Sequence, residues 1–226
     1  MADSSSTTLH TYWRSSCSYR VRIALAFKGV PYASAPVHLV RGGGEQHAPA
    51  YAALNPSRRV PTLEIDGLTL VQSGAMVEYL EETRPEPALL PRDAAARAHV
   101  RALCACVSND MQPLGNLAVL QHVAALLPAD APPEARAAAR DAWGRHWVAL
   151  GLAALEALMA PRAGRYSVGD DFSMADVFLA PQAYNAARLG LDLAPYPTIQ
   201  RVLAALEAHP AVQAAHPSAQ PDADKP

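Results

Sequence analysis

Cysteine is scarce in this chain of 226 residues, which contains only Cys17, Cys104 and Cys106. Three cysteines cannot build a disulfide framework, so we expect free thiols in a reducing compartment such as the cytoplasm. Cys104 and Cys106 lack the matching ligands of a zinc motif, and we predict no metal site there.

The chain also lacks a surplus of charge of one sign. It carries 19 Lys and Arg residues against 21 Asp and Glu residues, so no nucleic-acid partner is predicted. No run approaches the ~18 apolar residues of a membrane-spanning helix, and no block of basic residues indicates a membrane surface. Residues 1–6 show neither the basic nor the apolar segment of a secretory signal, so we expect none.

What the chain does have is hydrophobic residues, which make up 50% of it and allow a sizeable core. The first part alternates strand and helix signals. A helix over 18–28 is predicted to end at Gly29, with only the stem of Lys28 near the core. Asp66 and Gly67 are typical of a hairpin turn, and Ser73 is expected to cap the next helix. The expected strands are 9–13, 37–40, 62–65 and 68–70.

Strand signals vanish after residue 94 and alanine-rich helical segments take over. We therefore expect a thioredoxin-like α/β domain at 1–85, a proline-rich linker at 86–96 and an all-α domain at 97–226, with a frayed tail at 217–226.

Two local patterns refine the helical part. Ser173 and Asp176 fit a capping box at a helix start. A buried helix face is expected from residues at helical spacing, namely Trp147, Leu150, Ala154 and Leu158.

The most informative stretch is Ser15-Ser16-Cys17-Ser18, which precedes an apolar-periodic segment. A helix N-terminus presents unpaired N–H groups and a partial positive charge, so it stabilises an anion such as a thiolate. The reactive thiol is either Cys17 itself or a bound thiol cofactor that receives a hydrogen bond from Ser15. Taken alone, these residues also suit a plain helix cap.

Tyr12-Trp13-Arg14 followed by this stretch resembles the N-terminal signature of zeta-class glutathione S-transferases. The resemblance extends over residues 9–222 and includes Asn55-Pro56 and Val60-Pro61-Thr62-Leu63. It implies the glutathione S-transferase fold, a homodimer and glutathione as the cofactor. The Val60-Pro61 bond lies before a strand and is a candidate cis bond, which would turn the Val60 backbone outward. The resemblance implies that this backbone pairs with the cysteinyl part of glutathione.

The resemblance implies roles for further residues. Ser15 matches the activating serine, with Ser16 and Cys17 beside it as catalytic and cofactor-binding positions. Arg14 and Arg188 are the implied substrate-binding residues. The remaining implied glutathione contacts are Gln46, Val60, Gln72, Ser73, Gln112 and Asn116.

The implied activity is the glutathione-dependent cis–trans isomerisation of maleylacetoacetate, a small dicarboxylic substrate of aromatic amino-acid catabolism. The alternatives are maleylpyruvate isomerisation and a transferase or dehalogenase reaction on small halo-acids. Leu117 and Ala118 argue against maleylpyruvate, because relatives with that activity tend to carry an extra arginine after the Asn116 position. A thiol–disulfide oxidoreductase is disfavoured, since the stretch holds no Cys-x-x-Cys pair. A non-catalytic binding module of the same fold is the alternative from another class.

Overall fold

A computed structural model describes residues 7–223 of the chain. These residues form two compact units, 7–89 with 207–223, and Leu90–Leu206. Within residues 7–223, no helix combines the length and the apolar character that crossing a bilayer requires.

The first unit is built on a four-stranded sheet with the order β2-β1-β3-β4. β2 runs parallel to β1, whereas β3 is antiparallel to both β1 and β4. The expected hairpin and the Gly29 helix end are confirmed, and Gly29 has a φ of 65°. The elements up to residue 83 are β1 (Thr8–Thr11), α1 (Ser16–Phe27), β2 (Ala33–Pro36), the short 3-10 helices η1 (Arg41–Gly43) and η2 (Glu45–His47), α2 (Pro49–Leu54), β3 (Thr62–Ile65), β4 (Leu68–Val71) and α3 (Ser73–Thr83).

The second strand does not lie at 37–40, as the sequence led us to expect, but at Ala33–Pro36. Thr8 pairs with Ala33 and Thr11 with Pro36. The pairing therefore ends directly before residues 37–40, where the strand was expected. This strand is at the edge of the sheet, where proline is tolerated because one row of backbone groups has no partner strand.

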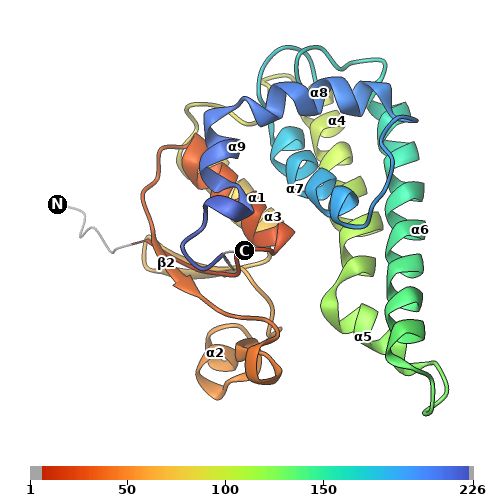
Figure 1. Ribbon diagram of the computed structural model, residues 1–226. Coiled ribbons are helices and arrows are strands. Elements are labelled where there is room, and N and C mark those ends of the chain that lie inside the picture. The colour runs from red at the N-terminus through yellow and green to blue at the C-terminus, as the bar shows by residue number, and fades with distance from the viewer. Residues whose placement is uncertain (1–6, 224–226) are drawn as a thin grey trace. The chain divides into compact units, whose positions relative to one another are not determined.

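Helices α1 and α3 pack together in this unit, and α9 (Pro210–Ala215) packs on α1 (Figure 1). The Tyr19 hydroxyl donates a 3.2 Å hydrogen bond to the Val212 carbonyl, and the described residues from Glu207 onward belong to this unit. The short helix η5 (Pro217–Ala219) follows, with Pro217 buried. A frayed tail is therefore wrong for residues 217–223, and residues 224–226 lie outside the described residues.

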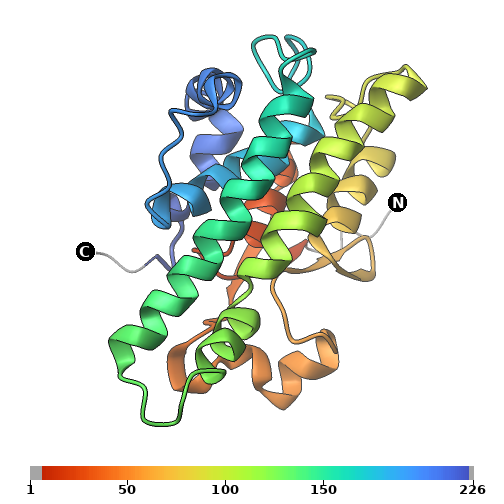
Figure 2. The same ribbon diagram turned by 90° about the vertical axis from the view of Figure 1, so that its right-hand side faces the viewer.

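The second unit is helical, as expected. Figure 2 shows α5 and α6 side by side, and both belong to this unit. Its elements are α4 (Ala94–Ala105), the π-helix η3 (Cys106–Met111), the 3-10 helix η4 (Gln112–Gly115), α5 (Leu117–Ala125), α6 (Pro133–Met159), α7 (Met174–Arg188) and α8 (Pro197–Glu207).

The capping box at the start of α7 is confirmed. The buried Asp176 carboxylate accepts hydrogen bonds from the amide and the hydroxyl of Ser173, and also from Ser167. The expected buried face of α6 is wrong, because Leu150 is 57% exposed and Leu158 is 42% exposed. The helix instead buries a face that contains two glycines, which comprises Gly144, Val148, Gly151, Leu152, Leu155 and Met159.

Candidate glutathione and substrate site

Ser15 caps the N-terminus of α1. Its backbone is extended, with φ −69° and ψ 122°, and its Oγ accepts a 3.2 Å hydrogen bond from the Ser18 amide. The Ser15 amide donates to the Tyr12 carbonyl at 3.0 Å, so the segment before the helix turns back on itself. The helix thus begins at Ser16, two residues earlier than the expected start at residue 18.

The Ser15 hydroxyl is equipped to donate a further hydrogen bond. Its oxygen accepts from Ser18, and its hydrogen has no acceptor within residues 7–223. The side chain is half-buried, as is the free thiol of Cys17, whereas Ser16 is buried. The first amides of the helix and the Ser15 hydroxyl can together stabilise an anion placed at this end.

The Val60-Pro61 bond is cis, as the proline before a strand led us to expect. Neither the amide nor the carbonyl of Val60 has a hydrogen-bond partner within residues 7–223. An extended peptide segment needs such a free backbone edge to pair with.

Two side chains hold the backbone on either side of this bond. The Tyr51 hydroxyl and the Asn55 amide both bond to the Arg59 carbonyl, at 2.7 and 2.8 Å, and to Thr62 Oγ1, at 3.0 and 2.9 Å. Burial raises the pKa of Tyr51, so its hydroxyl stays protonated and able to donate.

Val60 and the segment before Ser15 share one apolar cluster. The cluster is centred on buried Tyr12, Val37, Tyr51 and Val60, and Trp13 packs against it. This packing places the free backbone of Val60 and the N-terminus of α1 in the same region of the first unit.

Ser73 is the first residue of α3, and Gln72 is the cap residue. The expectation that Ser73 caps this helix is therefore wrong by one position. Ser73 is buried, and its Oγ accepts a 2.8 Å hydrogen bond from the buried Arg20 guanidinium. Exposed Gln72 has a φ of 70°, a left-handed conformation that costs about 1–3 kcal/mol in a residue other than glycine.

Gln46 is buried in η2. Its Nε2 donates to the Leu39 carbonyl at 3.3 Å, whereas its Oε1 is buried and has no partner within residues 7–223. A buried acceptor without a donor is costly, and a peptide N–H group would satisfy it. Gln46 Oε1 is therefore suited to accept from a peptide amide of a bound ligand.

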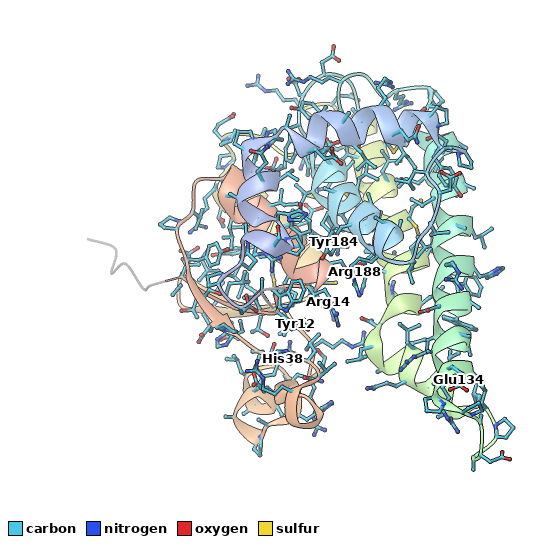
Figure 3. All side chains as sticks on the ribbon, in the orientation of Figure 1. Tyr12, Arg14, His38, Glu134, Tyr184 and Arg188 are labelled. Atoms are coloured by element: carbon cyan, nitrogen blue, oxygen red, sulfur yellow. The ribbon has the colours of Figure 1, made fainter. Side chains whose placement is uncertain are left out.

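Arg14 lies between the aromatic pair and Ser15. Its guanidinium is 6.0 Å from the ring centroid of Tyr12 and 5.7 Å from that of Trp13, as Figure 3 illustrates for Tyr12. The side chain is half-buried, so aromatic faces hold the guanidinium while part of it remains accessible. A guanidinium held in this way can bind a carboxylate through two parallel hydrogen bonds.

The other expected contacts lie in the second unit. Gln112 Nε2 donates a 3.1 Å hydrogen bond to Asn116 Oδ1, so these two side chains are held together at the turn before α5. Arg188 is exposed at the end of α7, with its guanidinium 6.0 Å from the Tyr184 ring centroid.

Glutathione fits the groups that this structure leaves unsatisfied in the first unit. A tripeptide with a thiol and two carboxylates needs donors for its anions and a backbone edge for its peptide groups. The Ser15 hydroxyl hydrogen, the Val60 backbone and Gln46 Oε1 are available for these purposes. Within residues 7–223, no cluster of three or more side chains could hold a metal ion.

Three polar residues near these positions were not predicted from the sequence. Arg20 and Arg22 are almost completely buried in α1, although a charged side chain inside an apolar helix was a visible signal. Asp222 accepts a hydrogen bond from the Trp13 amide, and no sequence pattern pointed to that contact.

Comparison with known proteins identifies the family of the chain. The models for the glutathione S-transferase N-terminal and C-terminal domains match residues 14–83 and 133–214. The maleylacetoacetate isomerase of Rattus norvegicus is 47% identical over 214 residues, which cover 95% of this chain and 94% of that protein.

Solved structures are similar as well. A holo structure of a bacterial zeta-class maleylpyruvate isomerase has a TM-score of 0.89 and 44% identity, covering 96% of this chain and all of that one. The maleylacetoacetate isomerase of Anaeromyxobacter dehalogenans, solved with glutathione in its active site, has a TM-score of 0.84 and 47% identity, covering 97% and 98%. Another structure of that enzyme holds dicarboxyethyl glutathione and citrate in the active site.

With matches of this identity over nearly its whole length, and with an N-terminal and a C-terminal domain of the same family, the chain belongs to the glutathione S-transferases, in the zeta-class group that contains the maleylacetoacetate isomerases.

Proposed function

We propose that this protein converts maleylacetoacetate to fumarylacetoacetate with glutathione as its cofactor. The observation that carries this proposal lies at the N-terminus of α1. There the hydroxyl hydrogen of Ser15 has no acceptor within residues 7–223, and Arg14 directly precedes Ser15 in the chain. The first group suits a thiolate and the second suits an acidic substrate. The names of the similar proteins support the same reaction class.

Glutathione, when bound, supplies the thiolate that adds reversibly to the cis double bond of the substrate, so that this bond can rotate. The chain must therefore favour the ionised thiol. Lowering a thiol pKa by ~2 units needs about 2.7 kcal/mol. A helix N-terminus contributes ~0.3–2 kcal/mol and a hydrogen bond to an anion ~1.5–3 kcal/mol. Ser15 and the first amides of α1 together reach that value, with Ser16 and Cys17 beside them.

The remaining contacts would orient the cofactor. We propose that Val60 pairs through its backbone with the cysteinyl residue, and that Ser73 and Gln72 at the start of α3 bind the γ-glutamyl end. Gln46 would accept from a peptide N–H group of the cofactor. Gln112 and Asn116 of the second unit are proposed as further cofactor contacts on the basis of the resemblance.

Arginines would hold the substrate. Arg14 is proposed to bind a substrate carboxylate and to stabilise the negative charge that develops on the substrate's carbonyl oxygen during the reaction. Arg188 is proposed as a second such group. The Anaeromyxobacter enzyme with dicarboxyethyl glutathione and citrate shows that a similar protein binds acidic ligands in its active site.

The decisive experiment compares maleylacetoacetate and maleylpyruvate as substrates, each with a catalytic amount of glutathione. We expect faster turnover of maleylacetoacetate without net consumption of glutathione. No turnover of either substrate would refute an isomerase. Preference for maleylpyruvate would favour the second candidate, which is supported by the similarity to a maleylpyruvate isomerase. Stoichiometric loss of glutathione with a halo-acid would instead indicate a transferase.

We further propose that the protein is a cytoplasmic homodimer. Its three cysteines carry no disulfide, in keeping with a reducing compartment. The dimer rests on the family resemblance, and the mass measured by light scattering in solution tests it.

A further inference from the structure

The segment that carries Arg14 and Ser15 is attached to the last residues of the chain. Asp222 Oδ2 accepts a 2.9 Å hydrogen bond from the backbone amide of Trp13, 209 residues earlier in the sequence. Both residues belong to the first compact unit.

A buried arginine holds the other side of the same residue. The Arg22 side chain is 1% exposed and donates from NH2 to the Trp13 carbonyl at 2.9 Å. Its NH1 reaches Thr11 Oγ1 at 3.1 Å, and its Nε donates to the Ala215 carbonyl of α9 at 3.0 Å. Arg22 therefore connects the C-terminal segment with the segment before α1.

These bonds fix the two peptide planes that flank Trp13. The Trp13 amide belongs to the plane shared with Tyr12, and the Trp13 carbonyl belongs to the plane shared with Arg14. Each plane is rigid, so holding the two groups restricts both backbone torsions of Trp13. The direction in which the chain enters Arg14 and Ser15 is thereby set.

The charges of Arg22 and Asp222 both act on the phenol of Tyr32. Burial raises the pKa of Tyr32, Arg22 lowers it and Asp222 raises it, so both charges lie within electrostatic reach of this phenol. The second carboxylate oxygen of Asp222, Oδ1, is buried without a partner within residues 7–223. The bond to Trp13 is thus the contact that orients this carboxylate.

We propose that Asp222 is a positioning residue for the isomerisation, acting through the Trp13 amide on the placement of Arg14 and Ser15. This inference rests on the proposed function. It assigns to the C-terminal segment a role in the active site that its distance in sequence does not suggest.

Asp222 suits a test better than Arg22, because its side chain is less buried and makes fewer hydrogen bonds. The side chain is half-buried and makes one hydrogen bond, whereas Arg22 is fully buried and makes at least four. Asp222→Ala removes the acceptor, and Asp222→Asn keeps an oxygen that can accept from Trp13. Glu82→Ala, which removes an exposed carboxylate from α3 of the same unit, is the matched control.

We expect Asp222→Ala to lower kcat with maleylacetoacetate roughly tenfold, because small displacements of reacting groups are costly. The pKa of the bound glutathione thiol, followed by thiolate absorbance, should rise, and the Trp13 amide should exchange faster with deuterium. Asp222→Asn should restore most of the activity, and Glu82→Ala should behave like the wild type.

Wild-type kcat and wild-type thiol titration in Asp222→Ala would overturn the proposal. Equal losses in Asp222→Ala and Asp222→Asn would also overturn it, because asparagine retains the acceptor. If the wild type does not isomerise maleylacetoacetate, the proposed function fails. The thiol titration and the deuterium exchange at Trp13 would still decide whether the contact positions the segment.

Discussion

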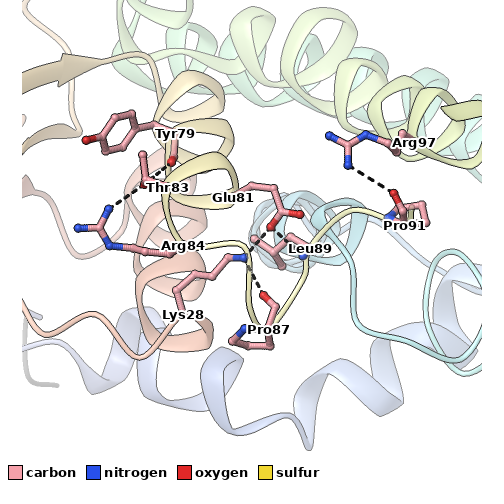
Figure 4. Close-up of polar contacts among 9 residues, drawn as sticks. All are labelled: Lys28, Tyr79, Glu81, Thr83, Arg84, Pro87, Leu89, Pro91 and Arg97. Atoms are coloured by element: carbon pink, nitrogen blue, oxygen red, sulfur yellow. Dashed lines mark hydrogen bonds and ion pairs between the residues drawn. The ribbon is translucent and has the colours of Figure 1, made fainter. Parts of the chain in front are cut away.

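Lys28 Nζ and Glu81 Oε2 lie 2.6 Å apart inside the first unit, and the Lys28 side chain is completely buried (Figure 4). The ammonium also donates to the Pro87 carbonyl at 2.6 Å, and Glu81 Oε2 accepts from the Leu89 amide at 2.9 Å. The pair thus joins the end of α1 to α3 and to the segment after α3.

Removal of one member of this pair is expected to destabilise the protein strongly. Lys28→Met leaves the Glu81 carboxylate buried without its counter-charge, and the loss in the free energy of unfolding should be about 3–5 kcal/mol. Adding Glu81→Gln should restore part of that loss, because the amide is neutral and its oxygen still accepts from Leu89. Urea unfolding of the wild type, both single variants and the double variant measures this coupling. A double variant with purely additive losses would contradict it.

Ser15→Ala is expected to impair turnover far more than Cys17→Ala. Loss of the hydroxyl donor at the α1 N-terminus should lower kcat roughly 10²–10³-fold, as removal of other anion-stabilising donors does. Cys17→Ala should cost less than about tenfold, because it leaves the cap and the backbone amides in place. Ser15→Thr keeps a hydroxyl and serves as the control. The reverse ranking of Ser15→Ala and Cys17→Ala would place the reactive centre at Cys17.

Local signals in the sequence predicted much of this unit. The Gly29 helix end, the Asp66-Gly67 turn and the cis bond before Pro61 depend on nearest neighbours or on a continuous motif, and each is confirmed. Contacts distant in sequence were not predictable in the same way. Lys28 was expected to bury only its stem, because nothing nearby in sequence indicated Glu81.

The missed features share this cause. The buried face of α6 was assigned from residues at helical spacing, whereas the helix buries a different face on which Gly151 leaves room for Met111. Proline-rich and polar residues made 217–223 look unstructured, although Asp222 bonds to Trp13. In each case the deciding partner lies tens of residues or more away along the chain.

Stability should depend on pH through Glu156, a residue of α6. Its Oε1 accepts from the Thr198 amide at 2.8 Å and its Oε2 from the Ile199 amide at 2.9 Å, so it caps the N-terminus of α8. Burial opposes ionisation, but the bonds from Thr198 and Ile199 and the Arg201 charge outweigh it, and the pKa of Glu156 is lowered. The carboxylate therefore stabilises the folded state above the unfolded-state pKa, and this stabilisation is lost as the pH falls through the folded-state pKa.

Glu156→Gln should accordingly destabilise the protein by about 1–2 kcal/mol near neutral pH. The difference from the wild type should shrink as the pH falls through the lowered pKa of Glu156, where the wild-type carboxyl becomes protonated in the folded protein. Urea unfolding at a series of pH values tests this, with exposed Glu82→Gln as the control. If the difference in unfolding free energy between Glu156→Gln and the wild type stays constant across the pH series, the ionised Glu156 carboxylate is not the group that stabilises α8.

Gly151 leaves the space that Met111 occupies at the end of the π-helix η3. A Cβ at position 151 would collide with Cγ and Sδ of Met111, which is completely buried. Gly151→Ala should therefore destabilise the protein by about 1–3 kcal/mol, despite the better helix propensity of alanine.

Two further variants test whether Gly151→Ala destabilises the protein through the collision with Met111 or through the loss of a flexible glycine. Gly115→Ala is the matched control, because a Cβ there meets no atom within 4 Å, and it should leave stability unchanged. Gly151→Ala combined with Met111→Ala should be more stable than the sum of the single losses predicts, since the smaller side chain removes the collision. Thermal and urea unfolding of the four proteins measure this. Additive losses in the double variant would show that Met111 is not what makes glycine necessary at position 151.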